Sequence, residues 1–150
     1  MTLDAKIDQF LERTLRVGRD ANGPPKLMSA LRHAVFPGGA RVRPKLCVAV
    51  AQACAPKADL SDALAAASAL ELLHCASLVH DDLPCFDDAD QRRGSPSVHA
   101  KYGENLAVLA GDSLIILAFQ TLALKAQTYF RELTLVMAEA TAPPNGIAAG

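Results

Sequence analysis

The sequence predicts an all-α fold in a single domain. Hydrophobic residues make up 51% of the 150 residues, but aromatic residues make up only 5% and Trp is absent. Alanine and leucine supply most of the apolar content and both favour helices, whereas β-branched residues are few. Clusters of Pro and Gly divide the chain into segments of helical length, and no internal repeat is present. A chain of this length can bury a core of its own.

Three helices are expected in the first third of the chain. Residues 3–19 carry apolar side chains along one side, which is the spacing of an amphipathic helix. The break Asn22-Gly23-Pro24-Pro25 precedes a short helix at residues 26–35, because proline can occupy a first helical turn. The run Phe36-Pro37-Gly38-Gly39 ends that helix, and residues 44–55 form a third, buried helix.

The central helix of the fold is expected at residues 63–79. Asp59 or Ser61 can serve as its N-cap, and it runs to about Asp82. Its side chains are nearly all apolar and small, which places it in the middle of the fold. Residues 83–96 are polar and are expected to form a connection.

Three more helical segments follow, at residues 98–102, 104–125 and 129–140. The most apolar run is residues 106–124, and Asp112 interrupts it. A charge is costly in lipid, so a buried helix is expected there and no membrane span. Asp112 is expected to pair with a buried donor.

Charge and cysteine usage narrow the class of function. The formal net charge of −1 gives no global field for nucleic acid or an anionic membrane, so any anion site must be local. No C-x-x-C pair indicates a zinc knuckle or a redox motif. Three cysteines lie in apolar helical stretches, and the set is interpreted as free buried thiols in a reducing cytosol: Cys47, Cys54, Cys75 and Cys85. Residues 1–10 carry no signal peptide, so a cytoplasmic location is expected.

An acidic segment at residues 80–94 carries the strongest chemical signal. It begins at the C-terminal end of an apolar helix, where the helix dipole is already negative. Mg²⁺ would offset the repulsion, and it usually binds through one or two carboxylates plus substrate phosphates. Arg92 and Arg93 follow, and guanidinium groups bind phosphate oxygens. The segment therefore predicts a metal-bridged phosphate ester, with a solvated acidic loop as the alternative. Its carboxylates are Asp81, Asp82, Asp87, Asp88 and Asp90.

A basic segment at residues 38–45 predicts a second anion site. Its paired glycines let the backbone approach an anion, and its cations stand at a helix N-terminus: Arg41, Arg43 and Lys45. Basic residues also flank many helices without binding a ligand, and that interpretation stays open. His74 lies two helical turns before Asp81 on the same side of the helix, which indicates a pocket residue or a satisfied core histidine.

These segments together resemble a known family. The patterns Gly-Gly-x-Arg-x-Arg-Pro, His-x5-His-Asp-Asp-Leu-Pro-x-x-Asp, Arg-Arg-Gly-x-Pro and Leu-Ala-Gly-Asp-x-Leu occur in this order within residues 36–117. In this combination the chain resembles the trans-polyprenyl diphosphate synthases, most of all the bacterial geranylgeranyl diphosphate synthases. The resemblance implies an isoprenoid synthase-type helical bundle around a central apolar cavity, and a homodimer.

The resemblance assigns roles to the acidic segment. Asp81 and Asp87 would ligate Mg²⁺ that bridges an allylic diphosphate, with Asp82 in support, and Arg92 would bind the same diphosphate. In the family's reaction, Mg²⁺ and arginine stabilise the departing diphosphate and an allylic carbocation forms. The double bond of isopentenyl diphosphate attacks the cation, and a proton is lost to the leaving diphosphate. The implied activity is that of a Mg²⁺-dependent prenyltransferase.

Other residues match the family's isopentenyl diphosphate site, namely Arg43, His74 and Arg93. The family usually has Lys where this chain has Ala40, so one contact to that substrate is lost. Arg41 is expected to compensate.

Two small residues predict the length of the product. Ser77 and Ala76 stand four and five positions before Asp81, below the metal site on the same helix face. In related farnesyl diphosphate synthases an aromatic residue blocks the tunnel at this level. The resemblance therefore implies a longer product here, geranylgeranyl diphosphate.

One departure from the family concerns the second aspartate-rich segment of its C-terminal half. After Asp112 the only acids are Glu132 and Glu139. Residues 1–150 are therefore expected to be the N-terminal half of a synthase, inactive when isolated. Two other functions stay open. A class I terpene cyclase shares an Asp-rich metal site but needs no isopentenyl diphosphate site, and a truncated chain could be a non-catalytic partner subunit of a full-length synthase.

Overall fold

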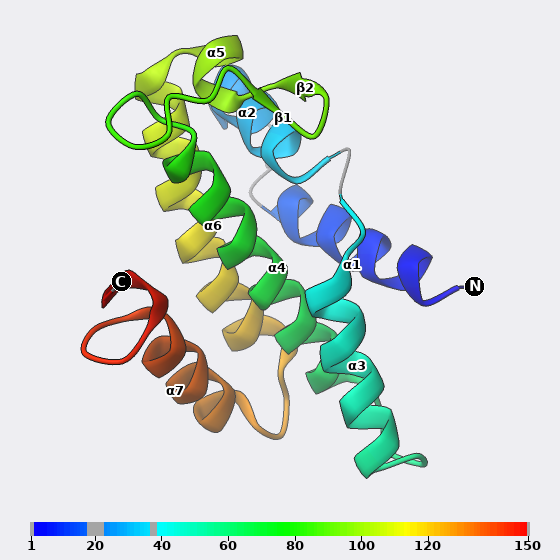
Figure 1. Ribbon diagram of the computed structural model, residues 1–150. Helices are drawn as coiled ribbons and strands as arrows, with labels where there is room; N and C mark the ends of the chain where they lie inside the picture. The colour runs from blue at the N-terminus through cyan, green and yellow to red at the C-terminus, as the bar shows by residue number, and fades with distance from the viewer. Residues whose placement is uncertain (1, 18–22, 37–38, 150) are drawn as a thin grey trace.

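The computed structural model describes residues 2–17, 23–36 and 39–149, and these form a bundle of seven α-helices (Figure 1). A two-stranded hairpin is the only β-structure of this part of the chain, so the predicted all-α class is confirmed. Asn22, Pro37 and Gly38, which were predicted to lie in breaks, fall outside the described residues. The elements are α1 (Leu3–Val17), α2 (Pro25–Val35), α3 (Val42–Cys54), α4 (Ser61–Asp81), β1 (Gln91–Arg92), β2 (Ser95–Pro96), α5 (Val98–Tyr102), α6 (Glu104–Lys125), α7 (Phe130–Thr141) and the 3-10 turn η1 (Ile147–Ala149).

The long helices α4 and α6 form the central pair of the bundle and run side by side (Figure 1). Small side chains fill the buried positions of both: Ala65, Ala69 and Ala76 on α4, and Ala107, Ala110 and Ala118 on α6. Small residues at a contact allow two helix axes to approach closely. Gly111 extends this contact, because a Cβ atom there would lie 2.1 Å from Nε2 of His80. The predicted central position of α4 is confirmed.

Helices α1, α2 and α3 pack around this pair. On α1, the predicted apolar side is confirmed, with Ile7, Leu11 and Leu15 in the core. Burial of each such side chain is worth about 1.5–3 kcal/mol. Helix α2 adds Leu31 and Val35 to the same core, and α3 packs on α4.

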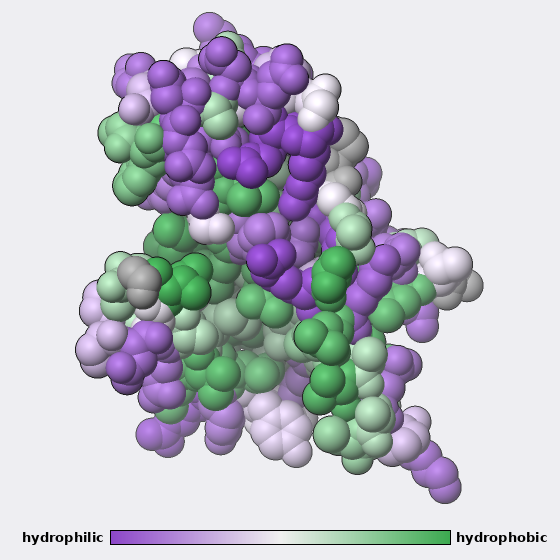
Figure 2. Space-filling model, in the orientation of Figure 1, coloured by the Kyte–Doolittle hydropathy of each residue, from purple (hydrophilic) through white to green (hydrophobic). Residues whose placement is uncertain are grey.

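Several apolar side chains stay on the surface of the described residues. Figure 2 shows polar residues over the end of the molecule that carries the hairpin, and apolar residues gathered in a hollow over the opposite half, along α3, α4 and α6. Exposed large residues include Val42, Leu46 and Val50 on α3, and Ile116 and Leu124 on α6.

Helices α4 and α6 are each long and apolar enough to cross a membrane, judged by length and composition alone. In α4, 61% of the most apolar window is buried within the chain, and in α6 39%. Core helices of proteins outside membranes meet the same criterion, so the expected absence of a membrane span stays a prediction.

Asp112 pairs with a buried donor as predicted, because its carboxylate lies 3.5 Å from the buried Nε2 of His80, although 62% of its own side chain is exposed. One expectation about the cysteines needs correction. The cysteines are free, as predicted, but only Cys75 is buried, while Cys54 and Cys85 are exposed. In both cases the residues lie on helix or loop faces that the described part of the chain does not cover.

Asp62 fixes the connection between α6 and α7. Its carboxylate accepts hydrogen bonds from the backbone N–H groups of Gln127 at 2.7 Å, and of Thr128 and Tyr129 at 3.0 Å. Although burial acts in the opposite direction, these three bonds lower the pKa of Asp62 from its ordinary value of 3.8.

We predict that Asp62→Asn lowers the free energy of unfolding at pH 7 by about 1–2 kcal/mol, the usual value of a lost helix cap. Because the folded-state pKa is depressed, the advantage of the wild type is fully present above pH 3.8 and disappears as the pH falls through the folded pKa. Urea unfolding at pH 7 and near pH 3 measures both. An equal difference at the two pH values would contradict this account.

Candidate diphosphate and metal site

The acidic segment begins where α4 ends and folds back on the end of the helix. The N–H of Asp87 donates to the carbonyl of Asp81 at 2.8 Å, and the N–H of Ala89 donates to the carbonyl of Asp82 at 3.1 Å. These bonds satisfy carbonyl groups that a helix end leaves free. They also bring Asp87 beside Asp81, although the two residues are six positions apart.

The side chains of Asp81 and Asp87 are exposed, and neither forms an ion pair with a described residue. Two free carboxylates on one turn fit Mg²⁺, which usually takes one or two carboxylates and completes its shell with substrate phosphates and water. Among the described residues, no three His, Cys, Asp or Glu side chains gather into a protein-only metal site.

Asp82 differs from Asp81 and Asp87 because its side chain is buried. Only 3% of its side chain is exposed, and its carboxylate accepts hydrogen bonds from Nε of Arg92 at 3.0 Å and from Nη2 of the same residue. The bond to Asp82 raises the pKa of Arg92, and the charges of Asp81 and Asp87 act in the same direction. In this structure Asp82 orients Arg92 and does not face solvent beside Asp81.

The hairpin β1–β2 presents Arg92 and Arg93. Its strands pair Arg92 with Ser95, and its turn residues Arg93 and Gly94 have φ of 54° and 77°. Positive φ at both central residues is the mark of a type I′ turn, which suits glycine but strains a long side chain. Within this turn the strain falls on Arg93, because glycine adopts positive φ without a steric cost.

Arg43 and Arg93 converge on His74. Nη1 of Arg43 donates to Nε2 of His74 at 3.3 Å, and Nη2 of Arg93 lies 3.4 Å from the same nitrogen. Burial lowers the pKa of His74, and the charge of Arg43 lowers it further, so the ring is neutral at pH 7 and the two guanidinium groups share the one lone pair of its Nε2. Neither arginine forms an ion pair with a carboxylate of the described residues. The three residues that resembled an isopentenyl diphosphate site are therefore brought together.

Gly39 provides the space in which the Arg93 guanidinium lies. A Cβ atom at Gly39 would be 2.7 Å from Cζ of Arg93, closer than van der Waals contact permits. The basic segment and the hairpin thus meet at one glycine. Gly38, the other predicted glycine, falls outside the described residues.

The other two cations of the basic segment do not join this group, which corrects the expectation for Arg41. The Arg41 side chain is 4% exposed and binds Glu71 and Asp8, so it cannot replace the missing lysine contact at Ala40. Lys45 pairs with Asp4 at 3.1 Å. The side chains of Arg41, Arg43 and Lys45 therefore have different neighbours, although the three residues alternate at the start of α3. Only Arg43 contacts His74.

Ala76 and Ser77 lie on α4 as predicted, but in different surroundings. Ala76 is 1% exposed and belongs to the apolar core, whereas Ser77 is half-buried and donates its hydroxyl to the carbonyl of His74 at 2.9 Å. Their role in product length stays a prediction.

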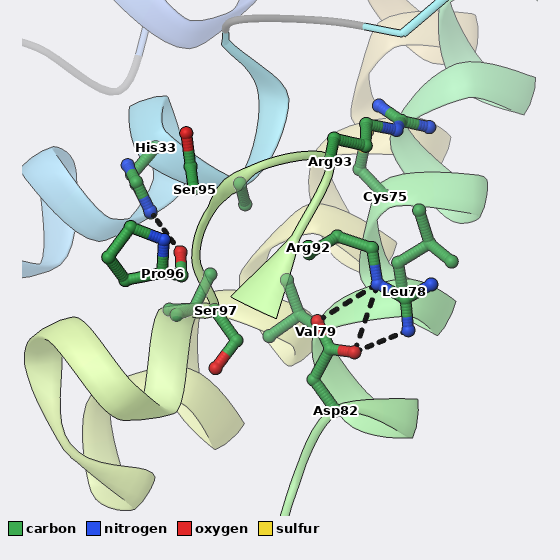
Figure 3. A pocket seen from close by; sticks show the side chains of 12 residues that line it. His33, Cys75, Leu78, Val79, Asp82, Arg92, Arg93, Ser95, Pro96 and Ser97 are labelled. Carbon is green, nitrogen blue, oxygen red and sulfur yellow. Dashed lines mark hydrogen bonds and ion pairs between the residues drawn. The ribbon is translucent and has the colours of Figure 1, made fainter. Parts of the chain in front are cut away.

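A pocket lies under the hairpin, between α2, α4 and α5 (Figure 3). Figure 3 shows Arg92 descending from the hairpin to Asp82, while Arg93 extends over α4 near Cys75. Burial raises the pKa of the Cys75 thiol to about 11, with the charge of Glu71 adding to it, so this thiol is not a nucleophile.

Two histidines that the sequence did not single out hold the site in place. Nε2 of His33 donates to the carbonyl of Pro96 at 2.8 Å, which ties the hairpin to α2 (Figure 3). Nε2 of His99 donates to the carbonyl of Ala89 at 3.0 Å, which ties the acidic segment to α5. Their acceptors are main-chain carbonyls, so no residue type in the sequence marks these contacts.

Comparison with known proteins agrees with this arrangement. The polyprenyl synthetase family matches residues 24–145. The geranylgeranyl diphosphate synthase of Cereibacter sphaeroides is 52% identical, over 100% of this chain and 53% of that protein. The corresponding synthase of Rhodobacter capsulatus is 56% identical, over 82% of this chain and 42% of that protein. A geranyltransferase structure from Legionella pneumophila matches with a TM-score of 0.82 and 35% identity, over 93% of this chain and 49% of that one.

The helical bundle, the turn from Asp81 to Asp87 (the acidic turn) and the structural neighbours place this chain in the class of isoprenoid synthase folds. The chain belongs to the polyprenyl synthetase family, which confirms the family and fold class predicted from the sequence. The chain spans about half the length of the curated relatives it matches.

We predict that Gly39→Ala weakens the binding of inorganic pyrophosphate by on the order of tenfold, equivalent to ~1.4 kcal/mol. The added methyl group displaces the flexible end of Arg93, so the melting temperature changes little. Isothermal titration calorimetry measures the affinity. In an Arg93→Gln background the same substitution should have no further effect. A loss of equal size in both backgrounds would show that Gly39 does not act through Arg93.

Proposed function

We propose that the protein is a prenyltransferase that condenses isopentenyl diphosphate with an allylic diphosphate head to tail, as part of a whole synthase. The observation that carries this proposal is the convergence of Arg43 and Arg93 on a neutral histidine, beside a turn with two free carboxylates. Such an arrangement would allow one diphosphate to bind without a metal and a second to bind through a metal ion.

Arg43, His74 and Arg93 are the proposed ligands of isopentenyl diphosphate. In the free protein, both guanidinium groups bond only weakly to His74, at 3.3 and 3.4 Å. A diphosphate would replace these contacts with short, charge-assisted bonds, and guanidinium groups can bind phosphate oxygens in pairs. The exchange costs little because no buried ion pair has to break.

The acidic turn is the proposed site of Mg²⁺ and the allylic diphosphate. Asp81 and Asp87 would hold the metal, which supplies Lewis-acid stabilisation of a leaving diphosphate when bound. Asp82 keeps Arg92 in one orientation, and 37% of the Arg92 side chain is exposed and open to a ligand. Arg92 would therefore stabilise the negative charge that develops as the allylic carbon–oxygen bond breaks.

The same arrangement bears on the alternative functions. A terpene cyclase uses a single diphosphate and has no need of the second cationic group around His74. The exposed carboxylates of Asp81 and Asp87 support an active metal site over a non-catalytic partner subunit.

We further propose a cytoplasmic homodimer. The exposed apolar side chains on α6 support burial of this helix against a second subunit: Val108, Leu109, Ile116 and Leu124.

We predict that Asp81→Ala or Asp87→Ala lowers kcat of the full-length synthase by about 100-fold or more, the usual cost of removing one preorganised electrostatic contact. Both side chains are exposed, so thermal stability should not change. Asp90→Asn is the matched control, because it removes one charge from the same segment. Turnover by either alanine variant at the wild-type rate would exclude the assignment.

We predict that the full-length synthase makes geranylgeranyl diphosphate, and that Ala76→Phe shifts the product towards farnesyl diphosphate. The ring must displace packed neighbours, at roughly 1–3 kcal/mol of stability. Ser77→Phe is the matched variant at a half-buried position. Chromatography of the dephosphorylated alcohols identifies the products. If both aromatic variants still release only the geranylgeranyl product, these residues do not form the floor of the tunnel.

A further inference from the structure

A buried ion pair lies directly behind the cationic group around His74. Nη1 of Arg41 donates to Oε1 of Glu71 at 2.8 Å, and the two side chains are only 4% and 2% exposed. The guanidinium also donates to Asp8 at 3.1 Å and to the carbonyl of Val35 at 3.0 Å. Every nitrogen of this guanidinium is therefore committed to a partner within the protein.

The two members of the pair are close neighbours of the proposed ligand-binding residues. Arg41 precedes Arg43 by two positions at the start of α3, and Glu71 precedes His74 by three positions on α4. Residues three apart on a helix lie on the same side, about one turn from each other. The charges of Glu71, Arg43 and Arg93 all act on the imidazole of His74, so the buried carboxylate and the two free guanidinium groups lie within electrostatic range of one group.

The backbone at Arg41 has an unusual conformation beside this pair. Arg41 adopts the left-handed conformation, with φ of 50° and ψ of 37°, immediately before α3 begins. That conformation is strained for a residue with a side chain and persists only where the surroundings determine it. Here the surroundings are the four groups that enclose its guanidinium: Glu71, Asp8, the Val35 carbonyl and the ring of Phe36, which lies 5.3 Å away.

We infer that Arg41 is a positioning residue that neutralises Glu71 and thereby leaves Arg43 and Arg93 free to bind a diphosphate. The inference rests on the proposed function of those two arginines. Without the Arg41 guanidinium, Glu71 would be a buried and unpaired carboxylate, which is strongly unfavourable. Arg43 and Arg93, which act on the same imidazole as Glu71, would turn towards that carboxylate, and it would compete with the ligand for their N–H groups.

Binding of inorganic pyrophosphate to charge variants of the protein tests the inference. Arg41→Met should weaken binding at least about tenfold, the effect of a charge pair a few ångströms apart in a partly buried site. The double variant Arg41→Met/Glu71→Gln should bind within about threefold of wild type, because the competing charge is gone. Glu71→Gln alone should also change the affinity less than about threefold, because Arg41 already neutralises that charge.

Asp8→Asn in the Arg41→Met background is the matched control. It removes the other carboxylate that contacts Arg41, but one that is 47% exposed, and it should not restore binding. Equal restoration by Asp8→Asn and Glu71→Gln would reduce the effect to net charge and overturn the inference. Wild-type affinity in Arg41→Met, or weak binding that persists in the double variant, would overturn it as well.

Folding and the ligand site are checked in the same series. If Arg41→Met does not fold, by circular dichroism, Arg41→Lys takes its place. It keeps a charge near Glu71 and should bind within about threefold of wild type, and a loss of tenfold or more would overturn the inference. Arg43→Gln and Arg93→Gln test the ligand site itself. If neither weakens pyrophosphate binding, the proposed site fails together with the inference. If they weaken it and Arg41 shows no coupling to Glu71, only the inference fails.

Discussion

The close packing of α4 on α6 is the contact on which the rest of the structure depends. Helix α4 carries Glu71, His74 and Asp81 along a single rigid element, so its placement sets the positions of all three. Small residues allow the two helices to approach, and Gly111 leaves room for His80 one residue before the acidic turn. A larger residue at that glycine would push against the end of α4, and the turn that carries Asp81 and Asp87 would move with it.

The cations of this region fall into two groups, those paired with a carboxylate of the protein and those without such a partner among the described residues. Arg41 is enclosed and paired with a buried carboxylate, and Arg92 is held by Asp82 at the edge of the pocket. Arg43 and Arg93 have only the neutral ring of His74 as a nearby partner among the described residues. A diphosphate binds most favourably to cations that have no carboxylate partner, because no existing ion pair has to be broken first. The site therefore depends on which carboxylates are already satisfied as much as on the number of arginines.

The sequence predicts the helices and the acidic turn well, for physical reasons that are local. Helix formation follows from the Ala and Leu content and from Pro and Gly breaks. A run of carboxylates at the negative end of an apolar helix is unfavourable without a cation, so it indicates a metal site. The convergence of Arg43, His74 and Arg93 follows only from family resemblance, since these residues lie in three separate segments. The contacts that hold these three residues in place cannot be inferred from their spacing in the sequence.

The features that were not predicted depend on long-range contacts. Arg41 and Arg43 are the same residue type two positions apart, and only the left-handed turn at Arg41 sends one inward and leaves the other at the surface. The hydrogen bonds from His33 and His99 are accepted by main-chain carbonyls. Every residue has such a carbonyl, so the sequence does not mark these partners. Asp112 pairs with the buried Nε2 of His80 as predicted, but its own exposure was not predicted, because it depends on which helix face the described residues cover.

We propose that one diphosphate binds at Arg43, His74 and Arg93 without a metal, and that a second binds through Mg²⁺ at the acidic turn. A crystal structure of the full-length synthase with inorganic pyrophosphate and Mg²⁺ tests it most directly. We expect one pyrophosphate in hydrogen-bond contact with Arg43 and Arg93. We expect a second pyrophosphate beside Arg92, bridged by metal to Asp81 and Asp87. Pyrophosphate bound away from His74, or metal bound without either aspartate, would contradict it.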